Sequence, residues 1–168
     1  VWDKLVAGLD GLDGLAVCRP SAAALRSLRH RVGEPVMCRL FEVVAGPMGR
    51  PDSPGVFHRG YRTVAFDGCS SIKTPDTDAH RHWLGHLRHR LGWIGYPRFM
   101  LMALVETGTR SLLGIRLGPV GAGSEVDYAR GLLSLLRADM LLLLDRGFDD
   151  AAFFADITAT GAALLARI

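Results

Sequence analysis

The spacing of hydrophobic side chains predicts a helical region over residues 1–48. A first helix is predicted at the start of the chain, because apolar residues recur there at helical spacing, at Val1, Trp2, Leu5, Val6 and Leu9. A second predicted helix starts at Ser21, its N-cap, and ends at Gly33. A third runs from Glu34 to about residue 46. The chain therefore opens with a helical N-terminal region.

Residues 49–60 are rich in Gly, Pro and Ser and are predicted to form a linker, after which the hydrophobic period changes. Five strands are predicted, over Tyr61–Asp67, Pro97–Glu106, Ser111–Leu117, Met140–Leu144 and Ala162–Ile168. Thr107–Thr109 joins the second and third strands as a hairpin, and helices are predicted over Ser124–Arg137 and Asp150–Ile157. The unbroken apolar run at 140–144 indicates a central strand covered on both faces.

This order of elements predicts an α/β domain with a mixed sheet over residues 61–168. The first three strands form an antiparallel meander, and a right-handed crossover through the helix returns the fourth strand parallel to the first. Asp67 then ends the first strand and Asp145 follows the fourth, so both carboxylates emerge at one edge, within about 4 to 7 Å of each other. Such a pair favours a bridging Mg²⁺ or Mn²⁺ ion. The alternative is ordinary turn chemistry, since Arg146 and Gly147 follow Asp145.

Composition limits the class of protein. The 168 residues, 49% hydrophobic and 22% charged, suit one compact domain with a helical appendage and exclude disordered and fibrous classes. No apolar run approaches the roughly 18 residues that span a bilayer, no signal peptide is recognisable, and the three cysteines form no CxxC pair. We therefore expect a cytoplasmic protein without membrane contact or small-molecule substrate. Because the chain starts at Val1 and ends at Ile168 without a stop signal, we expect a piece truncated at both ends.

The basic charge is carried almost entirely by arginine. The net charge is +3 and the pI about 9.0, and only Lys4 and Lys73 are lysines. The planar guanidinium group of arginine can donate two parallel hydrogen bonds to phosphate oxygens, which favours a nucleic-acid partner. A GC-rich genome, however, also enriches arginine. The candidate DNA contacts are Arg26, Arg29 and Arg31 on the second helix, Arg81, Arg88 and Arg90 in the basic tract 80–98, and Arg146.

Each of these groups has a plainer alternative. The helices around Gly33 permit helix-turn-helix docking but are also typical of an ordinary helical hairpin with a charged outer face. The tract 80–98 interleaves histidines with Trp83 and Trp93, which suits base stacking, but a solvated connector fits equally well. A zinc site there lacks any standard ligand spacing.

Two further motifs are incomplete. Gly118, Gly121 and Gly123 between a strand and a helix resemble a nucleotide cradle, but Val126 occupies the third glycine position and no P-loop lysine is present. Neither serine that follows Asp67 lies in a GxSxG elbow, which argues against a Ser-His-Asp triad.

Three runs of sequence, in order, resemble the DDE transposases of bacterial insertion sequences, in the insertion element 4 group. The runs are VAFDG (Val64–Gly68) with TPDT (Thr74–Thr77), FMLMALVETGTRSLLGIRLGP (Phe99–Pro119) followed by GSE (Gly123–Glu125), and LLLLDRGF (Leu141–Phe148) with TGA (Thr160–Ala162). The helical region resembles that family's N-terminal region through VWDKLVAGL and PSAAALRSLRHRVG. The resemblance covers nearly the whole chain.

The resemblance implies a ribonuclease H-like core and an enzyme that cuts and joins DNA with divalent metal. It implies that Asp67 and Asp145 are the first two acidic residues of the DDE triad and that the protein forms a homodimer when it pairs two DNA ends. The third residue, a glutamate, follows the second aspartate in the family, but no Glu follows Asp145 here. Glu106 and Glu125 stand in the wrong order, and Glu125 is expected to favour its helix N-terminus by charge and capping. We therefore expect this piece to be inactive alone.

Overall fold

The computed structural model describes residues 20–85, 87–89 and 92–167 and divides the chain into two compact units, Val1–Val44 and Ala45–Ile168. In the first unit, helix α2 spans Ala22–Val44 and is interrupted at Gly33, whose φ of 73° and ψ of 171° are not helical. The side chain of Ser21 accepts a hydrogen bond from the Ala24 N–H at 3.1 Å, as an N-cap does. The two predicted helices on either side of Gly33 are therefore confirmed, whereas the helix predicted over residues 1–9 lies outside the described residues.

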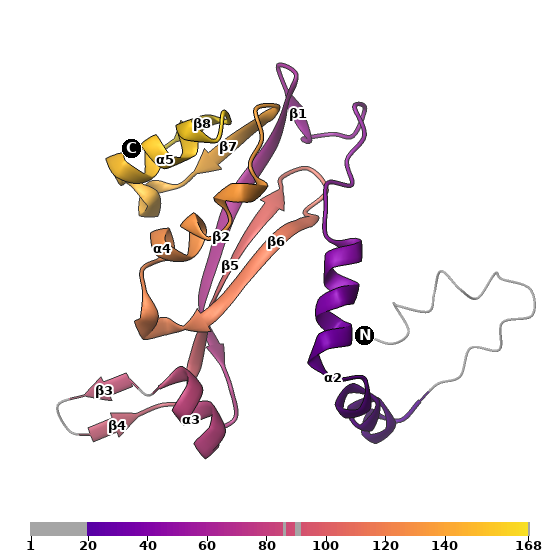
Figure 1. Ribbon diagram of the computed structural model, residues 1–168, viewed down its shortest axis with the longest axis vertical. Coiled ribbons are helices and arrows are strands. Elements are labelled where there is room, and N and C mark those ends of the chain that lie inside the picture. Colours follow the sequence, from indigo (N-terminus) through magenta and orange to yellow (C-terminus); the bar gives the residue numbers. More distant parts are fainter. Residues whose placement is uncertain (1–19, 86, 90–91, 168) are drawn as a thin grey trace, which may run out of the picture. The chain divides into compact units, whose positions relative to one another are not determined.

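The second unit is built on a mixed sheet (Figure 1). Its strands are β1 (Phe57–His58), β2 (Tyr61–Lys73), β5 (Arg98–Glu106), β6 (Leu112–Pro119), β7 (Met140–Leu144) and β8 (Ala163–Ala166). The strand order is β6-β5-β2-β7-β8, with β1 paired to β2, and a separate hairpin joins β3 (Leu87–His89) to β4 (Gly92–Ile94). The antiparallel meander, the parallel β2–β7 pair and hence the α/β class are confirmed. Strand β1 lies in the stretch predicted to be a linker and was missed because it is only two residues long.

Short helices connect these strands. They are α3 (Asp78–Leu84), α4 (Glu125–Arg130) and α5 (Ala151–Ala159), with 3₁₀ turns η1 (Val120–Ala122), η2 (Leu133–Leu135) and η3 (Arg146–Phe148). The prediction of one helix over Ser124–Arg137 is wrong beyond Arg130. Gly131, a poor helix former, follows directly, and its backbone lies so close to the Arg116 side chain that a Cβ would clash. No helix within the described ranges is long and apolar enough to cross a membrane.

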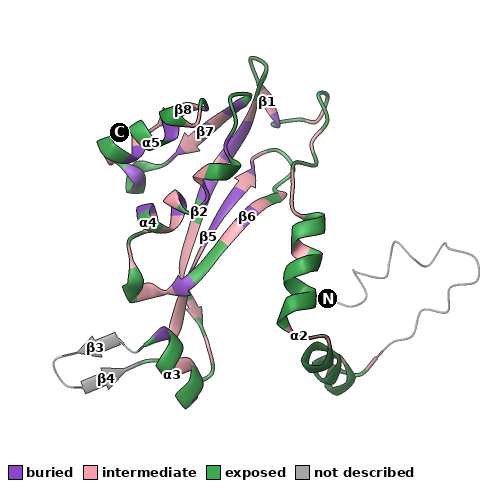
Figure 2. Cartoon of the chain, viewed as in Figure 1, coloured by how far each residue is buried: buried purple, intermediate pink, exposed green. Residues whose placement is uncertain are grey.

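The core lies on one face of the sheet (Figure 2). Alternate residues of the central strands are fully buried there, namely Val64, Met102, Leu104 and Leu142. Helix α4 covers them through Val126 and Ala129, and α5 through Phe153 and Ile157. These helices begin at firm caps, since Ser124 and Asp127 form a capping box for α4 and the Asp150 side chain caps α5.

Helices α4 and α5 leave the opposite face of the sheet uncovered. Its positions on β7, Leu141 and Leu143, are half-buried, and Leu165 on β8 is 61% exposed. The prediction that the apolar run of β7 is covered on both faces is therefore wrong for the described part of the chain. The run does mark a central strand, but α4 and α5 both pack on the same side of it.

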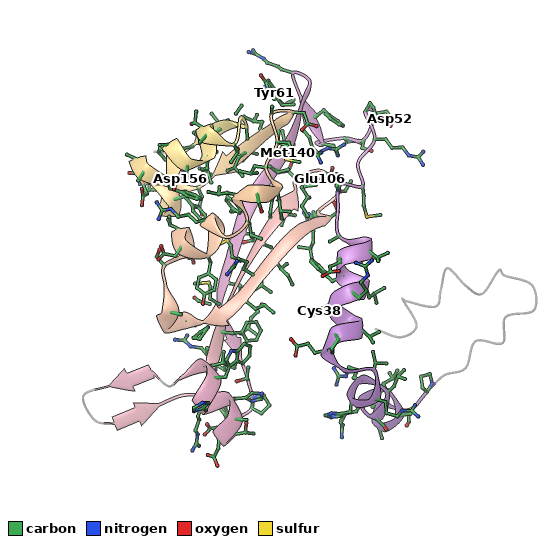
Figure 3. All side chains as sticks on the ribbon, in the orientation of Figure 1. Cys38, Asp52, Tyr61, Glu106, Met140 and Asp156 are labelled. Atoms are coloured by element: carbon green, nitrogen blue, oxygen red, sulfur yellow. The ribbon has the colours of Figure 1, made fainter. Side chains whose placement is uncertain are left out.

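A buried ion pair closes the hairpin end of the sheet. Glu106, the last residue of β5, has no exposed surface and accepts hydrogen bonds from Arg62, Thr109 and the Gly49 N–H, the last at 2.8 Å (Figure 3). Burial by itself raises the pKa of the Glu106 carboxyl, but these hydrogen bonds outweigh it, so the pKa is lowered. The Arg62 guanidinium also lies 4.7 Å from the centre of the Phe57 ring, which joins β1 to the same cluster.

Candidate active site

The two predicted catalytic aspartates lie at matching positions of neighbouring parallel strands. The β2–β7 register pairs Val64 with Leu142 and Ala65 with Leu143. Continued by two residues, the same register sets Asp67 opposite Asp145, and adjacent strands lie about 4.8 Å apart. Both side chains are exposed. The sheet topology thus brings together two residues that are far apart in the sequence.

The prediction that Asp67 ends its strand is wrong. Asp67 lies in the middle of β2. Strand β2 continues to Lys73, and beyond Asp67 it pairs with β5 alone, through a bulge between Cys69 and Ile72. Strand β7 stops at Leu144, just before Asp145. The edge on which the aspartates meet is therefore made by the end of β7, not by the end of β2.

Asp145 is held by the turn that follows it. Its Oδ1 accepts a hydrogen bond from the Gly147 N–H at 2.9 Å, which makes it the N-cap of η3. One carboxylate oxygen of Asp145 therefore has the ordinary turn role that the sequence indicated as the alternative to metal binding. Among the described residues, Oδ2 of Asp145 and both oxygens of Asp67 have no hydrogen-bond or ion-pair partner within the protein. Unpaired, exposed carboxylate oxygens are the donors that a hard divalent cation takes.

The carboxylate of Glu125 lies near Asp145. A Cβ built on Gly68 would lie 3.3 Å from Oε1 of Glu125, and one built on Gly147 would lie 3.1 Å from Oδ1 of Asp145 and 3.9 Å from Oε2 of Glu125. Glycine at both positions therefore leaves room for the Glu125 side chain between β2 and η3. Asp127, rather than Glu125, completes the capping box of α4, so the capping role expected for Glu125 is wrong. Sequence order gave no signal for this placement, because Glu125 precedes Asp145.

Asp67 faces a cavity on the open side of the sheet. This cavity has a volume of about 540 Å³ and is lined by Ala65, Phe66, Asp67, Val105, Thr107, Arg110 and Leu112. A second cavity, of about 330 Å³, lies toward β7 and β8, where Leu141, Leu143 and Leu165 line it, and it shares Thr107 with the first. Volumes of this size are typical of ligand sites, which combine apolar walls with a few polar groups.

The predicted DNA contacts are divided between the two units of the chain. Arg26, Arg29 and Arg31 are exposed on α2 in the first unit, whereas Arg81 and Arg146 belong to the second. Arg90 and the side chain of Arg88 lie outside the described residues.

Two of these arginines are already engaged. Nε and Nη2 of Arg81 donate to the two oxygens of Asp76 at 2.7 and 2.6 Å, and these bonds raise the pKa of the guanidinium. Arg146 also has a partner within the protein. Arg81 is therefore a poor candidate for phosphate contact, since it would have to leave a bidentate pair.

The glycine-rich turn is explained by packing. Gly118 lies against the ring of Tyr128, where a Cβ would clash, and the Tyr128 hydroxyl donates to the Pro119 carbonyl at 2.8 Å. Ser124 and Asp127 satisfy the N-terminus of α4, which leaves its first turn occupied by the protein itself. These contacts argue against the nucleotide-cradle alternative.

Comparison with known proteins adds no assignment. Neither the models of known protein families nor the curated proteins include a match to this chain. Within the described ranges, no three His, Cys, Asp or Glu side chains are arranged to hold a metal ion. The candidate site therefore rests on the aspartate pair and the surfaces around it.

Proposed function

We propose that this chain belongs to a DNA transposase of the DDE class, in which Asp67 and Asp145 hold a divalent cation. The observation that carries the proposal is the parallel pairing of β2 with β7, whose register, continued by two residues, would set Asp67 opposite Asp145. The strand order β6-β5-β2-β7-β8, with three antiparallel strands followed by two parallel ones, supports the finer assignment of a ribonuclease H-like fold. The resemblance of the three sequence runs points to the same class.

The residues fit a divalent cation by the chemistry of their donors. Three carboxylate oxygens of Asp67 and Asp145 lack partners among the described residues, and no cationic side chain forms an ion pair with either aspartate there. Bound at this pair, Mg²⁺ or Mn²⁺ would lower the pKa of a water or 3′-hydroxyl and stabilise the oxygen that leaves a phosphodiester. Asp145 is fixed by the Gly147 N–H, which keeps its second oxygen turned outward.

Glu125 adds a negative charge near Asp145. A Cβ on Gly147 would lie 3.1 Å from Oδ1 of Asp145 and 3.9 Å from Oε2 of Glu125. Cleavage and joining of DNA with two metal ions would need at least one ligand besides the two aspartates.

A titration with Mn²⁺ followed by thermal unfolding tests the proposal. We expect saturating Mn²⁺ to raise the Tm by about 3 to 5 °C, because a ligand that binds only the folded state stabilises it by mass action. Asp67→Asn and Asp145→Asn should each abolish most of this rise. Asp52→Asn, which removes the same charge from an exposed turn, is the matched control and should keep it. A wild-type chain that does not respond to Mn²⁺, or a response that survives both aspartate variants, would contradict the proposal.

A second candidate is a DNA-binding remnant of a transposase without catalysis. It is favoured by the three exposed arginines of α2 and by the lack of a three-residue metal group among the described residues. It predicts salt-sensitive DNA binding that neither Mn²⁺ nor Asp67→Ala changes. Binding measured by fluorescence anisotropy with and without Mn²⁺ separates the two candidates.

A further inference from the structure

The cavity beside Asp67 has a negative and a positive end. Asp67 lines it on β2, and Arg110 lines it from the turn between β5 and β6. The two side chains form no ion pair with each other, and the Arg110 guanidinium has no hydrogen-bond or ion-pair partner in the described part of the chain. Between them the walls are apolar, formed by Ala65, Val105 and Leu112.

Arg110 occupies a backbone position that arginine rarely adopts. Its φ is 60°, in the left-handed region where glycine or asparagine is favoured, and its N–H donates to the Glu106 carbonyl at 2.8 Å. A non-glycine residue there costs about 1 kcal/mol. The turn therefore carries an exposed cation at the margin of the cavity where an uncharged glycine would fit the backbone better.

We propose that Arg110 binds a backbone phosphate of a DNA strand that lies in this cavity on its way to the aspartate pair. This inference rests on the proposed function, because the strand is the substrate of that site. A cation at Asp67 and Asp145 gives one positive centre, and Arg110 gives a second across an apolar floor. A nucleotide strand has the complementary chemistry, with anionic phosphates separated by sugars and bases that pack on apolar walls.

The chain offers a matched control in Arg59. Arg59 is also exposed and left-handed, with a φ of 49°, in the turn between β1 and β2, but it does not line the cavity. Replacing either arginine with glycine removes one positive charge and relieves the same backbone conformation. Both variants therefore make the same change of charge and backbone, but only Arg110→Gly removes a charge that lines the cavity.

The test measures the affinity of the full chain for a short fluorescein-labelled single-stranded DNA by anisotropy, in the presence of Mn²⁺, at several salt concentrations. We expect Arg110→Gly to raise the Kd about five- to tenfold and to reduce the slope of log K against log salt by about 0.7, the value for one phosphate contact on a single strand. Arg59→Gly should change the Kd less than about twofold. Compared with Arg110→Gly, Arg110→Lys should regain most of the salt slope but less of the affinity. Lysine keeps the positive charge but cannot make the two parallel hydrogen bonds of a guanidinium.

The outcomes separate this inference from the proposed function. If the wild-type chain binds DNA in an Mn²⁺-dependent manner and Arg110→Gly behaves like Arg59→Gly, the inference is overturned and the proposed function stands. If the wild-type chain binds no DNA under any condition, both are overturned. Equal unfolding midpoints of the two glycine variants confirm that a difference in Kd does not come from a loss of fold.

Discussion

Both faces of the central sheet carry apolar side chains, but their surroundings differ. On one face, Val64, Met102 and Leu142 have no exposed surface, because α4 and α5 pack over them. On the other, Leu112, Leu117 and Leu165 are 41%, 49% and 61% exposed, and two cavities flank β2. The covered face supplies the stability of the domain, whereas the open face presents Asp67 and Arg110.

Side chains that stabilise the core and side chains of the candidate site alternate along a single strand, β2, and so point to opposite faces of the sheet. Val64 and Phe66 point into the core from β2, whereas Ala65 and Asp67 face the cavity. A shift of the strand by one residue would exchange the two sets and bury the aspartate. The pairing of β2 with both β5 and β7 holds the register that prevents this.

The strongest test of the comparison uses two neighbouring leucines of β7. Leu142 is fully buried and Leu143 half-buried, so Leu142→Ala should lower the free energy of unfolding by about 4 kcal/mol and Leu143→Ala by about 1 kcal/mol. Urea unfolding at neutral pH measures both. Equal losses would show that the second face is also packed in solution.

A smaller effect is expected at the ion pair that closes the hairpin end. Glu106→Gln should cost about 3 kcal/mol, because it leaves the Arg62 charge poorly compensated in a site where Glu106 has no exposed surface. The folded pKa of Glu106 is lowered, so its contribution is fully present above the unfolded value and disappears as the pH falls through the folded pKa. The difference between wild type and variant should therefore narrow below pH 4.5, the ordinary value for glutamate. A difference that stays constant down to about pH 3, roughly 1.5 units lower, would contradict this assignment.

The smallest effect concerns the cap of α4, one of the helices that cover the core. The Ser124 side chain accepts from the Asp127 N–H at 3.2 Å, and Asp127 accepts from the Ser124 N–H at 2.8 Å. Ser124→Ala should cost about 1 kcal/mol. Ser134→Ala, at an exposed position of η2, is the control and should cost less than about 0.5 kcal/mol. If both variants unfold at the same urea concentration, the cap does not stabilise the covering helix.

Much of the fold could be predicted because its signals are local. The N-cap at Ser21, the break at Gly33 and the hairpin turn after Glu106 each depend on a few neighbouring residues. The apolar run Met140–Leu144 located a central strand of the sheet, since such runs are typical of strands with neighbours on both edges. Boundaries that depend on distant contacts were predicted less well. Helix α4 ends where Gly131 lies against Arg116 on β6, and β2 extends past Asp67 through its pairing with β5.

The candidate site divides in the same way. The sequence by itself determined five of the strands, the antiparallel pairing of the first three and the parallel return of the fourth beside the first, because residue type and period decide which segments can pair. It also singled out the two aspartates. Only the tertiary structure decided that Glu125 lies beside Gly68 and Gly147, that Arg81 is bound to Asp76, and that Arg110 shares a cavity with Asp67. These relations join residues through space, where the distance between two side chains depends on packing and register and not on their separation along the chain.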